Sequence, residues 1–140
     1  IFITYALYSQ LENEDQLAGV LGHEIGHVIG RHSAERIAET EFWQGMATAG
    51  NVGADVGGIV QQYGQGKLLK NGRGDELESD DLGVLFMINS GYNPEEMVGV
   101  MEILKKAAGP NRIPEFQSTH PDPDNRIEKI REAIRKHSEN

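Results

Sequence analysis

The 140-residue sequence contains no cysteine. Disulfide bonds and thiolate metal ligands are therefore excluded, and His, Asp and Glu are the protein ligands left for a metal ion. No run approaches the roughly 18 apolar residues that a membrane-spanning helix needs, so we expect no membrane span within the chain. Basic residues are few, 13 against 22 acidic ones, and the net charge of −9 argues against nucleic acid as a partner.

The length and composition are those of one soluble globular domain. A chain of 140 residues can bury about two thirds of its unfolded surface around one core. The hydrophobic share of 38% and the charged share of 25% fit this class. We therefore expect residues 1–140 to form a single domain. Because the chain starts on apolar residues without Met, we also expect it to be an excerpt from a longer protein.

Helix signals recur along the chain, whereas the strand signal is confined to its start. The β-branched and aromatic residues 1–5 predict a strand. Asn13, with Gln16 three residues later, predicts a helix that begins near Glu14. Further helices are expected over residues 33–43, 75–90 and 93–109, and from Asp122-Pro123 to His137. The Gly-rich residues 45–66 are equally compatible with a small-residue helix and a mobile flap. The predicted fold class is α+β, mainly α, with a small sheet.

Residues 21–28 carry a His-Glu-x-x-His motif within one of these helices. His23 and His27 are four residues apart, so a helix places both imidazoles on one face, within reach of one metal ion. Glu24 projects beside them, where its carboxylate can take a proton from metal-bound water. The motif predicts a catalytic metal site on this helix.

The rest of this helix carries two further patterns. An apolar stripe at helical spacing is expected to face the core, and it consists of Leu17, Leu21, Ile25, Val28 and Ile29. Gly22, Gly26 and Gly30 recur every four residues, which either permits the close approach of another element or marks loose packing.

A catalytic zinc takes a third protein ligand and leaves the fourth position to water. The candidates are His32, Glu76, Glu78, Asp80, Asp81 and His120. The metzincin pattern requires a third His at position 33, which is Ser33 here, so His32 is one residue out of register and is expected to point elsewhere. Glu76 is the better candidate because Asp80, one helical turn later, can accept the free ring N–H of a ligand histidine. The alternative is a solvated acidic helix start without a ligand role.

Four stretches together resemble one family: residues 21–28, Arg31-His32-Ser33-Ala34, the Asp-Glu-Leu-Glu-Ser-Asp of residues 75–80 with Gly83, and Gly91-Tyr92-Asn93-Pro94. They are similar to the zinc metallopeptidases that include the CaaX prenyl endopeptidases and the HtpX-type and bacterial periplasmic quality-control proteases. The resemblance implies a zincin-like core of the gluzincin type, with an active-site helix, a second ligand-bearing helix and a small, truncated sheet. It also implies one Zn²⁺ per chain on His23, His27 and Glu76, with Glu78 not a ligand.

The family also has a Ser/Thr-x-His-Pro segment with an Arg six residues after the His, and His120 and Arg126 match it. An N–H donor and a cation near the metal can hold the oxyanion that forms when hydroxide adds to a peptide carbonyl. The alternatives are a turn residue for His120 and a surface ion pair for Arg126. A further hypothesis has His120 bind zinc as a fourth ligand in a resting state.

The resemblance implies a zinc-dependent endopeptidase with Glu24 as general base and acid, acting on protein or peptide substrates. It favours a location in the bacterial cell envelope or periplasm and a role in protein quality control. The sequence departs from the family at Ser79, usually Ala, and at Asn71-Gly72, where an apolar or aromatic residue is more usual.

Family members usually have an edge strand just before the stretch that corresponds to residues 1–4, and this strand would align a substrate by strand addition. Without it, we expect zinc binding with poor cleavage. The competing hypothesis is a catalytically weak or inactive zinc-binding module that acts through protein–protein contacts. Another is a different zinc hydrolase on the same ligands.

Overall fold

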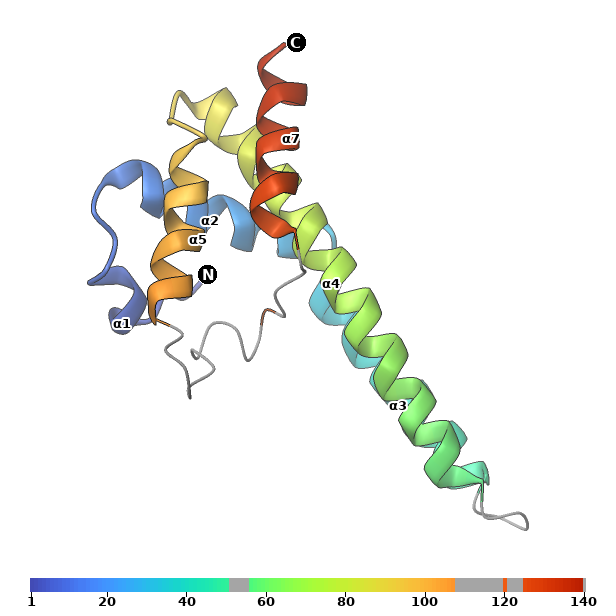
Figure 1. The fold of residues 1–140 in the computed structure, drawn as a ribbon. Coiled ribbons are helices and arrows are strands. Elements are labelled where there is room, and N and C mark those ends of the chain that lie inside the picture. Colours follow the sequence, from blue (N-terminus) through green and yellow to red (C-terminus); the bar gives the residue numbers. More distant parts are fainter. Residues whose placement is uncertain (51–55, 108–119, 121–124, 140) are drawn as a thin grey trace.

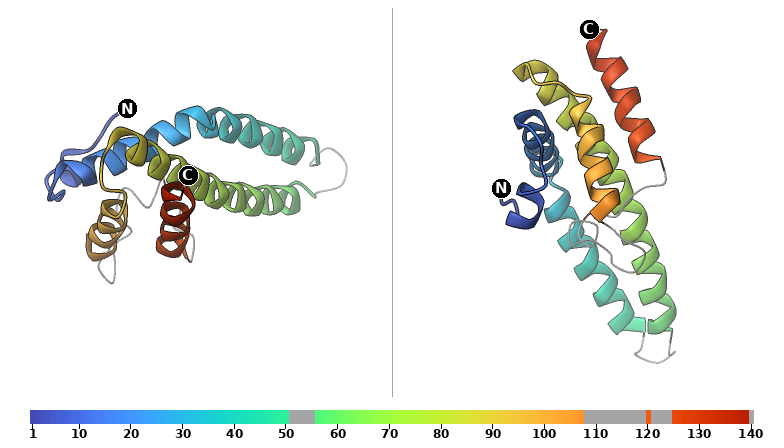
Figure 2. Two further views of the ribbon diagram at one scale, coloured as in Figure 1. Left: turned by 90° about the horizontal axis from the view of Figure 1, so that it is seen from above. Right: turned by 60° about the vertical axis from the view of Figure 1, so that its left-hand side comes forward.

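The computed structural model describes residues 1–50, 56–107, 120 and 125–139, and in these ranges the regular elements are helices (Figure 1). Helices α3 and the N-terminal part of α4 run side by side as a long hairpin that extends from the rest of the molecule (Figures 1 and 2). Helices α2 and α7 pack on the C-terminal part of α4, and α5 packs on α2 and α7. The helices are α1 (Tyr5–Tyr8), α2 (Glu14–Ile29), α3 (His32–Gly50), α4 (Gly57–Ser90), α5 (Glu96–Ala107) and α7 (Arg126–Ser138).

The strand predicted for residues 1–5 is wrong. Thr4 has extended backbone angles, but it caps α1, because its hydroxyl oxygen accepts a hydrogen bond from the backbone N–H of Leu7 at 3.3 Å. An extended segment becomes a strand only when a neighbouring strand pairs its backbone groups, and the described ranges contain no strand. The mainly helical class is therefore found, and the small sheet is not found in this part of the chain.

The predicted start of α2 is confirmed. The side-chain oxygen of Asn13 accepts a hydrogen bond from the backbone N–H of Gln16 at 2.8 Å. The Gln16 side chain in turn accepts from the backbone N–H of Glu12 at 2.8 Å, so two donors at the open end of the helix are satisfied.

Helix α4 is longer than predicted. Its start was expected at Asp75, but it runs without a break from Gly57 and ends at Gly91, whose positive φ of 80° gives the predicted glycine stop. The acidic start signal is overridden because α3 packs along the preceding turns; the Trp43 side chain lies directly on Gly64. In residues 45–50 and 57–66 the helix alternative is therefore the correct one, and residues 51–55 lie outside the described ranges.

The remaining helices bear out their predictions with shifted starts. Helix α5 begins at Glu96, and its expected end at Gly109-Pro110 lies outside the described residues. Helix α7 follows Asn125 and ends at Ser138, one residue beyond the predicted end at His137, while the proposed start at Asp122-Pro123 also lies outside the described residues. These two helices enclose the main core with α4; its buried members are Val84, Met87, Met97, Val98, Ile130, Ala133 and Ile134.

The apolar stripe of α2 does not face the core, contrary to the prediction. Val28 and Ile29 are 69% and 59% exposed. The glycine row packs inward instead: a Cβ on Gly22 would lie 3.2 Å from Cα of Gly83, and one on Gly26 would lie 2.8 Å from Cα of Ser79. The missing side chains let the backbones of α2 and α4 approach closely, and this approach buries the histidine face of α2. No helix in the described ranges is both long and apolar enough to span a membrane.

Candidate metal centre

Four side chains converge where α2 packs on α4. His23 and His27 come from one face of α2, Glu76 comes from α4, and His120 precedes α7 in the chain. One ligand-type atom from each lies within 4.8 Å of the other three. Glu76 therefore lies next to the histidine pair, as predicted, although it is 49 residues from His27 in the sequence.

The distances within this cluster match the size of a zinc ion. Nε2 of His27 lies 3.0 Å from Nε2 of His23 and 3.2 Å from Oε1 of Glu76, and Nε2 of His23 lies 3.4 Å from Oε2 of Glu76. Ligand atoms at tetrahedral corners, each about 2.0–2.1 Å from zinc, are separated by about 3.3 Å. Oε2 of Glu76 is buried and accepts no hydrogen bond from the described residues; its charged neighbour is Nη1 of Arg126 at 3.3 Å, so it keeps capacity to bind a metal. The residues present therefore fit zinc.

His120 lies within the cluster at a fourth corner. Its Nδ1 is 3.0 Å from Oε1 of Glu76 and 3.4 Å from Nε2 of His23, and its Nε2 is 3.5 Å from Oε1 of Glu24. The same ring can therefore reach a metal between the other ligands or a substrate oxygen beside them. This position is the one that the resting-state hypothesis for His120 requires.

Asp80 and Arg126 lie behind the histidines, and both are buried. Oδ1 of Asp80 is 2.8 Å from Nδ1 of His23, which leaves Nε2 of that ring to face the cluster. Arg126 donates to both oxygens of Asp80, at 2.6 Å from Nε and 2.9 Å from Nη2. Its Nη1 is also 3.3 Å from Oε2 of Glu76. The alternative of a surface ion pair for Arg126 is therefore wrong.

The electrostatics of the cluster favour ionised carboxylates. Burial by itself raises the pKa of Glu76, but hydrogen bonds with His120, His23 and His27 lower it far more, so that the pKa lies well below its ordinary value. Burial likewise opposes the charge on Asp80, and hydrogen bonds with His23 and Arg126 outweigh it and lower the pKa. For His23, burial lowers the pKa, whereas the hydrogen bonds with Asp80 and Glu76 raise it more, and the net shift is upward. Because a metal binds the neutral imidazole at Nε2, a raised pKa of His23 makes metal binding weaker in acid.

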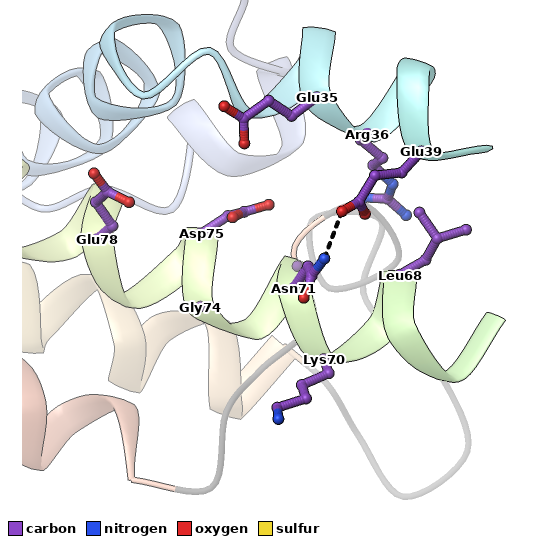
Figure 3. Close-up of a pocket in the computed structure, with 10 residues that line it drawn as sticks. Glu35, Arg36, Glu39, Leu68, Lys70, Asn71, Gly74, Asp75 and Glu78 are labelled. Carbon is purple, nitrogen blue, oxygen red and sulfur yellow. Dashed lines mark hydrogen bonds between the residues drawn. The ribbon is translucent and has the colours of Figure 1, made fainter. Parts of the chain in front are cut away.

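The two candidate glutamates on α4, Glu76 and Glu78, point in different directions. Glu78 points away from the cluster into a pocket of about 430 Å³ between α3 and α4, where its side chain is 61% exposed (Figure 3). In the same pocket Asn71, one of the departures from the family pattern, donates a hydrogen bond to Glu39 of α3 at 2.7 Å (Figure 3). Of the two, only Glu76 faces His23 and His27.

His32 is not part of the ligand cluster, as its register predicted. The prediction that its side chain points away from the site is wrong. Its Nδ1 is 2.9 Å from Nδ1 of His27. The register argument missed this contact because it compared His32 with a sequence pattern and did not consider the path of the chain after α2. The helix breaks at Arg31, which has a φ of 59°, so His32 begins a new helix with a new direction.

Residues 1–134 match the model of peptidase family M48. The chain belongs to this family. The metallopeptidase family predicted from the motifs is confirmed. The chain is 32% identical to the mitochondrial metalloendopeptidase OMA1 of Schizosaccharomyces pombe, over 96% of this chain and 41% of that protein. It is also 32% identical to the beta-barrel assembly-enhancing protease of Yersinia pestis, over 90% of this chain and 29% of that protein.

A third relative, the metalloprotease YcaL of Escherichia coli, is 28% identical, with 93% of this chain and 53% of that protein covered. The chain thus spans between 29% and 53% of the length of these three relatives. No solved structure matches the chain. Because the relatives include both mitochondrial and bacterial proteins, membership of the M48 family does not by itself assign a compartment.

Proposed function

We propose that this M48 domain is a zinc-dependent endopeptidase in which His23, His27 and Glu76 hold a single zinc ion. The observation that carries the proposal is the cluster in which these three side chains lie 3.0–3.4 Å apart, together with His120. Every ligand in this set is nitrogen or oxygen, which agrees with a chain that lacks cysteine.

When bound, zinc supplies a Lewis acid for the scissile carbonyl and a water acidic enough to lose its proton near neutral pH. Glu24 is the residue we place as general base, since it follows the first ligand histidine and its carboxylate, which is 25% exposed, lies 3.5 Å from Nε2 of His120. It takes the proton of the attacking water and passes it to the leaving amine. His120, whose Nε2 lies 3.5 Å from Glu24, is placed to donate to the oxyanion.

We assign a positioning role to Arg126 and Asp80. The sequence predicted an oxyanion role for Arg126, and this stays a prediction. The buried guanidinium contacts Asp80 and Glu76, which favours a role in holding these carboxylates and, through Asp80, the ring of His23. Asp80 then accepts the Nδ1–H of His23, so that the lone pair on Nε2 points at the metal position.

The proposed substrates are proteins or peptides. We propose a role in protein quality control in the cell envelope, as the family resemblance implies; one relative is named a beta-barrel assembly-enhancing protease.

The test compares the purified chain with its Glu24→Gln variant, which keeps the shape of the side chain and removes its basicity. Metal analysis should find one zinc per chain in both proteins, and an anomalous signal should lie between His23, His27 and Glu76. Casein cleavage should occur only in the wild type and should be abolished by a chelator. Retained cleavage in the Glu24 variant would refute the mechanism. Zinc without casein cleavage in the wild type would support the alternative of an inactive zinc-binding module.

A further inference from the structure

His32 is brought to His27 by a local break in the chain. On one continuous helix, residues five apart lie about 140° apart around the axis, so the two rings would not meet. Here α2 ends at Ile29, and Arg31 adopts a left-handed conformation with a φ of 59° before His32 begins α3. A non-glycine residue in this conformation costs on the order of 1 kcal/mol, and such strain is found at functional sites. The break turns the His32 ring back over the last turn of α2.

The position of the His32 ring depends on two glycines, Gly30 and Gly26. A Cβ on Gly30 would overlap Nε2 of His32 and would lie 2.6 Å from its Cε1, so a larger residue there would displace the ring. Gly26 allows α4 to come close enough for Ser79 to cover the other side, with Oγ 3.3 Å from Nδ1 of His32. As a result the imidazole is only 5% exposed, although it follows directly on a chain reversal.

Only one tautomer of His27 allows both this contact between the rings and metal binding. Nδ1 of His27 and Nδ1 of His32 are 2.9 Å apart, so one of them carries the hydrogen and the other accepts it. Nε2 of His27 faces His23 and Glu76 in the ligand cluster and needs a free lone pair to bind a metal. The hydrogen of His27 must then be on Nδ1, with His32 as its acceptor. Nε2 of His32 is left as the donor, and it is 3.5 Å from the carboxylate of Glu78.

We propose that His32 is a positioning residue that accepts the Nδ1–H of His27 and so presents Nε2 of His27 to the zinc. The inference rests on the proposed zinc site and extends it. His23 is oriented by Asp80, and His27 is oriented by His32, whose own ring position depends on the space at Gly30. Residues that orient metal ligands in this way typically contribute about 10–100-fold to metal affinity.

The test compares two substitutions of different chemistry. His32→Phe fills the space and removes the acceptor, whereas His32→Asn places a carbonyl oxygen close to the position of Nδ1. Zinc dissociation constants, measured by competition with a chromogenic chelator, should be about 10–100-fold weaker for His32→Phe. His32→Asn should recover most of this loss. As a matched control, Ser79→Ala removes the other polar neighbour of Nδ1 and should bind zinc nearly as the wild type does.

A second readout reports the hydrogen bond directly. ¹⁵N chemical shifts of the imidazoles in the zinc-loaded wild type should show His27 protonated at Nδ1 and His32 protonated at Nε2. Gly30→Ala should weaken zinc binding by displacing the ring, and this penalty should shrink in the double variant with His32→Asn, whose shorter side chain leaves room for the new methyl group. This pair keeps the proposal testable if His32→Phe fails to fold.

Three results would overturn the proposal. His32→Phe could bind zinc as tightly as the wild type, or His32→Phe and His32→Asn could lose zinc affinity and thermal stability equally, which would make His32 a packing residue. The shifts could also show His27 protonated at Nε2 with zinc bound elsewhere. A wild type that binds no zinc at all would instead overturn the proposed function itself, and metal analysis of the wild type distinguishes this failure from the others.

Discussion

Asp80→Asn replaces one oxygen of a buried carboxylate by an NH₂ group and removes its charge without changing its size. In the wild type Oδ1 accepts from His23 at 2.8 Å and from Arg126 at 2.9 Å, and Oδ2 accepts from Arg126 at 2.6 Å. The amide has a single acceptor oxygen, so its NH₂ group must face a donor of either Arg126 or His23. At least one of these hydrogen bonds is therefore lost at a buried site.

The size of the effect follows from the burial of Arg126. Removing one partner of a buried ion pair costs about 3–5 kcal/mol. Oε2 of Glu76, 3.3 Å from Nη1 of Arg126, remains as a second carboxylate, which places the expected loss near the lower limit, at about 3 kcal/mol. For a domain of this size the melting temperature should fall by about 10 °C. Zinc affinity should fall by about tenfold or more, because the ring of His23 is no longer oriented.

The assay is thermal unfolding of the chelator-treated protein, followed by circular dichroism over a range of pH, together with zinc competition. Burial by itself raises the pKa of Asp80. Hydrogen bonds with His23 and Arg126 lower this pKa by more, so that it lies below its ordinary value of 3.8. A lowered carboxyl pKa gives stability that is present above the unfolded pKa and is lost as the pH falls through the folded one. Because Asp80 also raises the pKa of His23, the gap between the two melting temperatures should be largest between about pH 6 and pH 5; it should narrow above about pH 7 and again below about pH 4.

The matched control is Asp81→Asn on the next residue. Asp81 pairs at the surface with Lys136 at 3.0 Å and with His137 at 3.2 Å, so its loss should cost no more than about 1 kcal/mol. An Asp80→Asn protein that melts and binds zinc like the wild type would refute the reasoning. Asp80 would then be a buried residue without a positioning role.

The other predictions concern the ligand set and the packing of α2. Glu76→Ala should lose both zinc and casein cleavage; metal analysis that still finds one zinc per chain would remove Glu76 from the ligand set. Gly26→Ala should cost about 1–3 kcal/mol in urea unfolding, because its Cβ would lie 2.8 Å from Cα of Ser79; unchanged stability would argue against the close approach of α2 and α4. Val28→Thr should change stability by less than about 0.5 kcal/mol, since the side chain is exposed, whereas Ile130→Ala should cost about 2–5 kcal/mol. A loss of stability well above about 0.5 kcal/mol for Val28→Thr would indicate that the apolar stripe of α2 is buried in the core.

Local spacing was sufficient for the parts of the site that one helix carries. His23, Glu24 and His27 share a turn of α2, and the start of that helix at Asn13 follows from side-chain hydrogen bonds between near neighbours. The four-residue interval between Glu76 and Asp80 likewise predicted that both would project from one face of a helix, with Asp80 behind a ligand histidine. These features depend on the helical repeat alone, and the repeat is the same wherever the helix lies.

Other features depended on the partner that each segment meets. Sequence patterns predicted that the apolar stripe of α2 would be buried, but the glycine row at Gly22 and Gly26 lets the backbone of α4 approach on the histidine face. They also predicted a helix start at Asp75, which the packing of α3 against α4 overrides, and a strand at residues 1–5, for which the described chain contains no partner.

The sequence by itself therefore determined the reacting groups of this protein: the His-Glu-x-x-His helix, the likeness to a zinc metallopeptidase family and the candidates for the remaining positions. The tertiary structure alone decided that Arg126 is buried against Asp80 and that His32 lies against His27. The physical reason is that a helix specifies which side chains share a face, whereas the face that becomes buried is chosen by contacts between segments far apart in the chain. A single left-handed residue such as Arg31 changes the direction of everything that follows it.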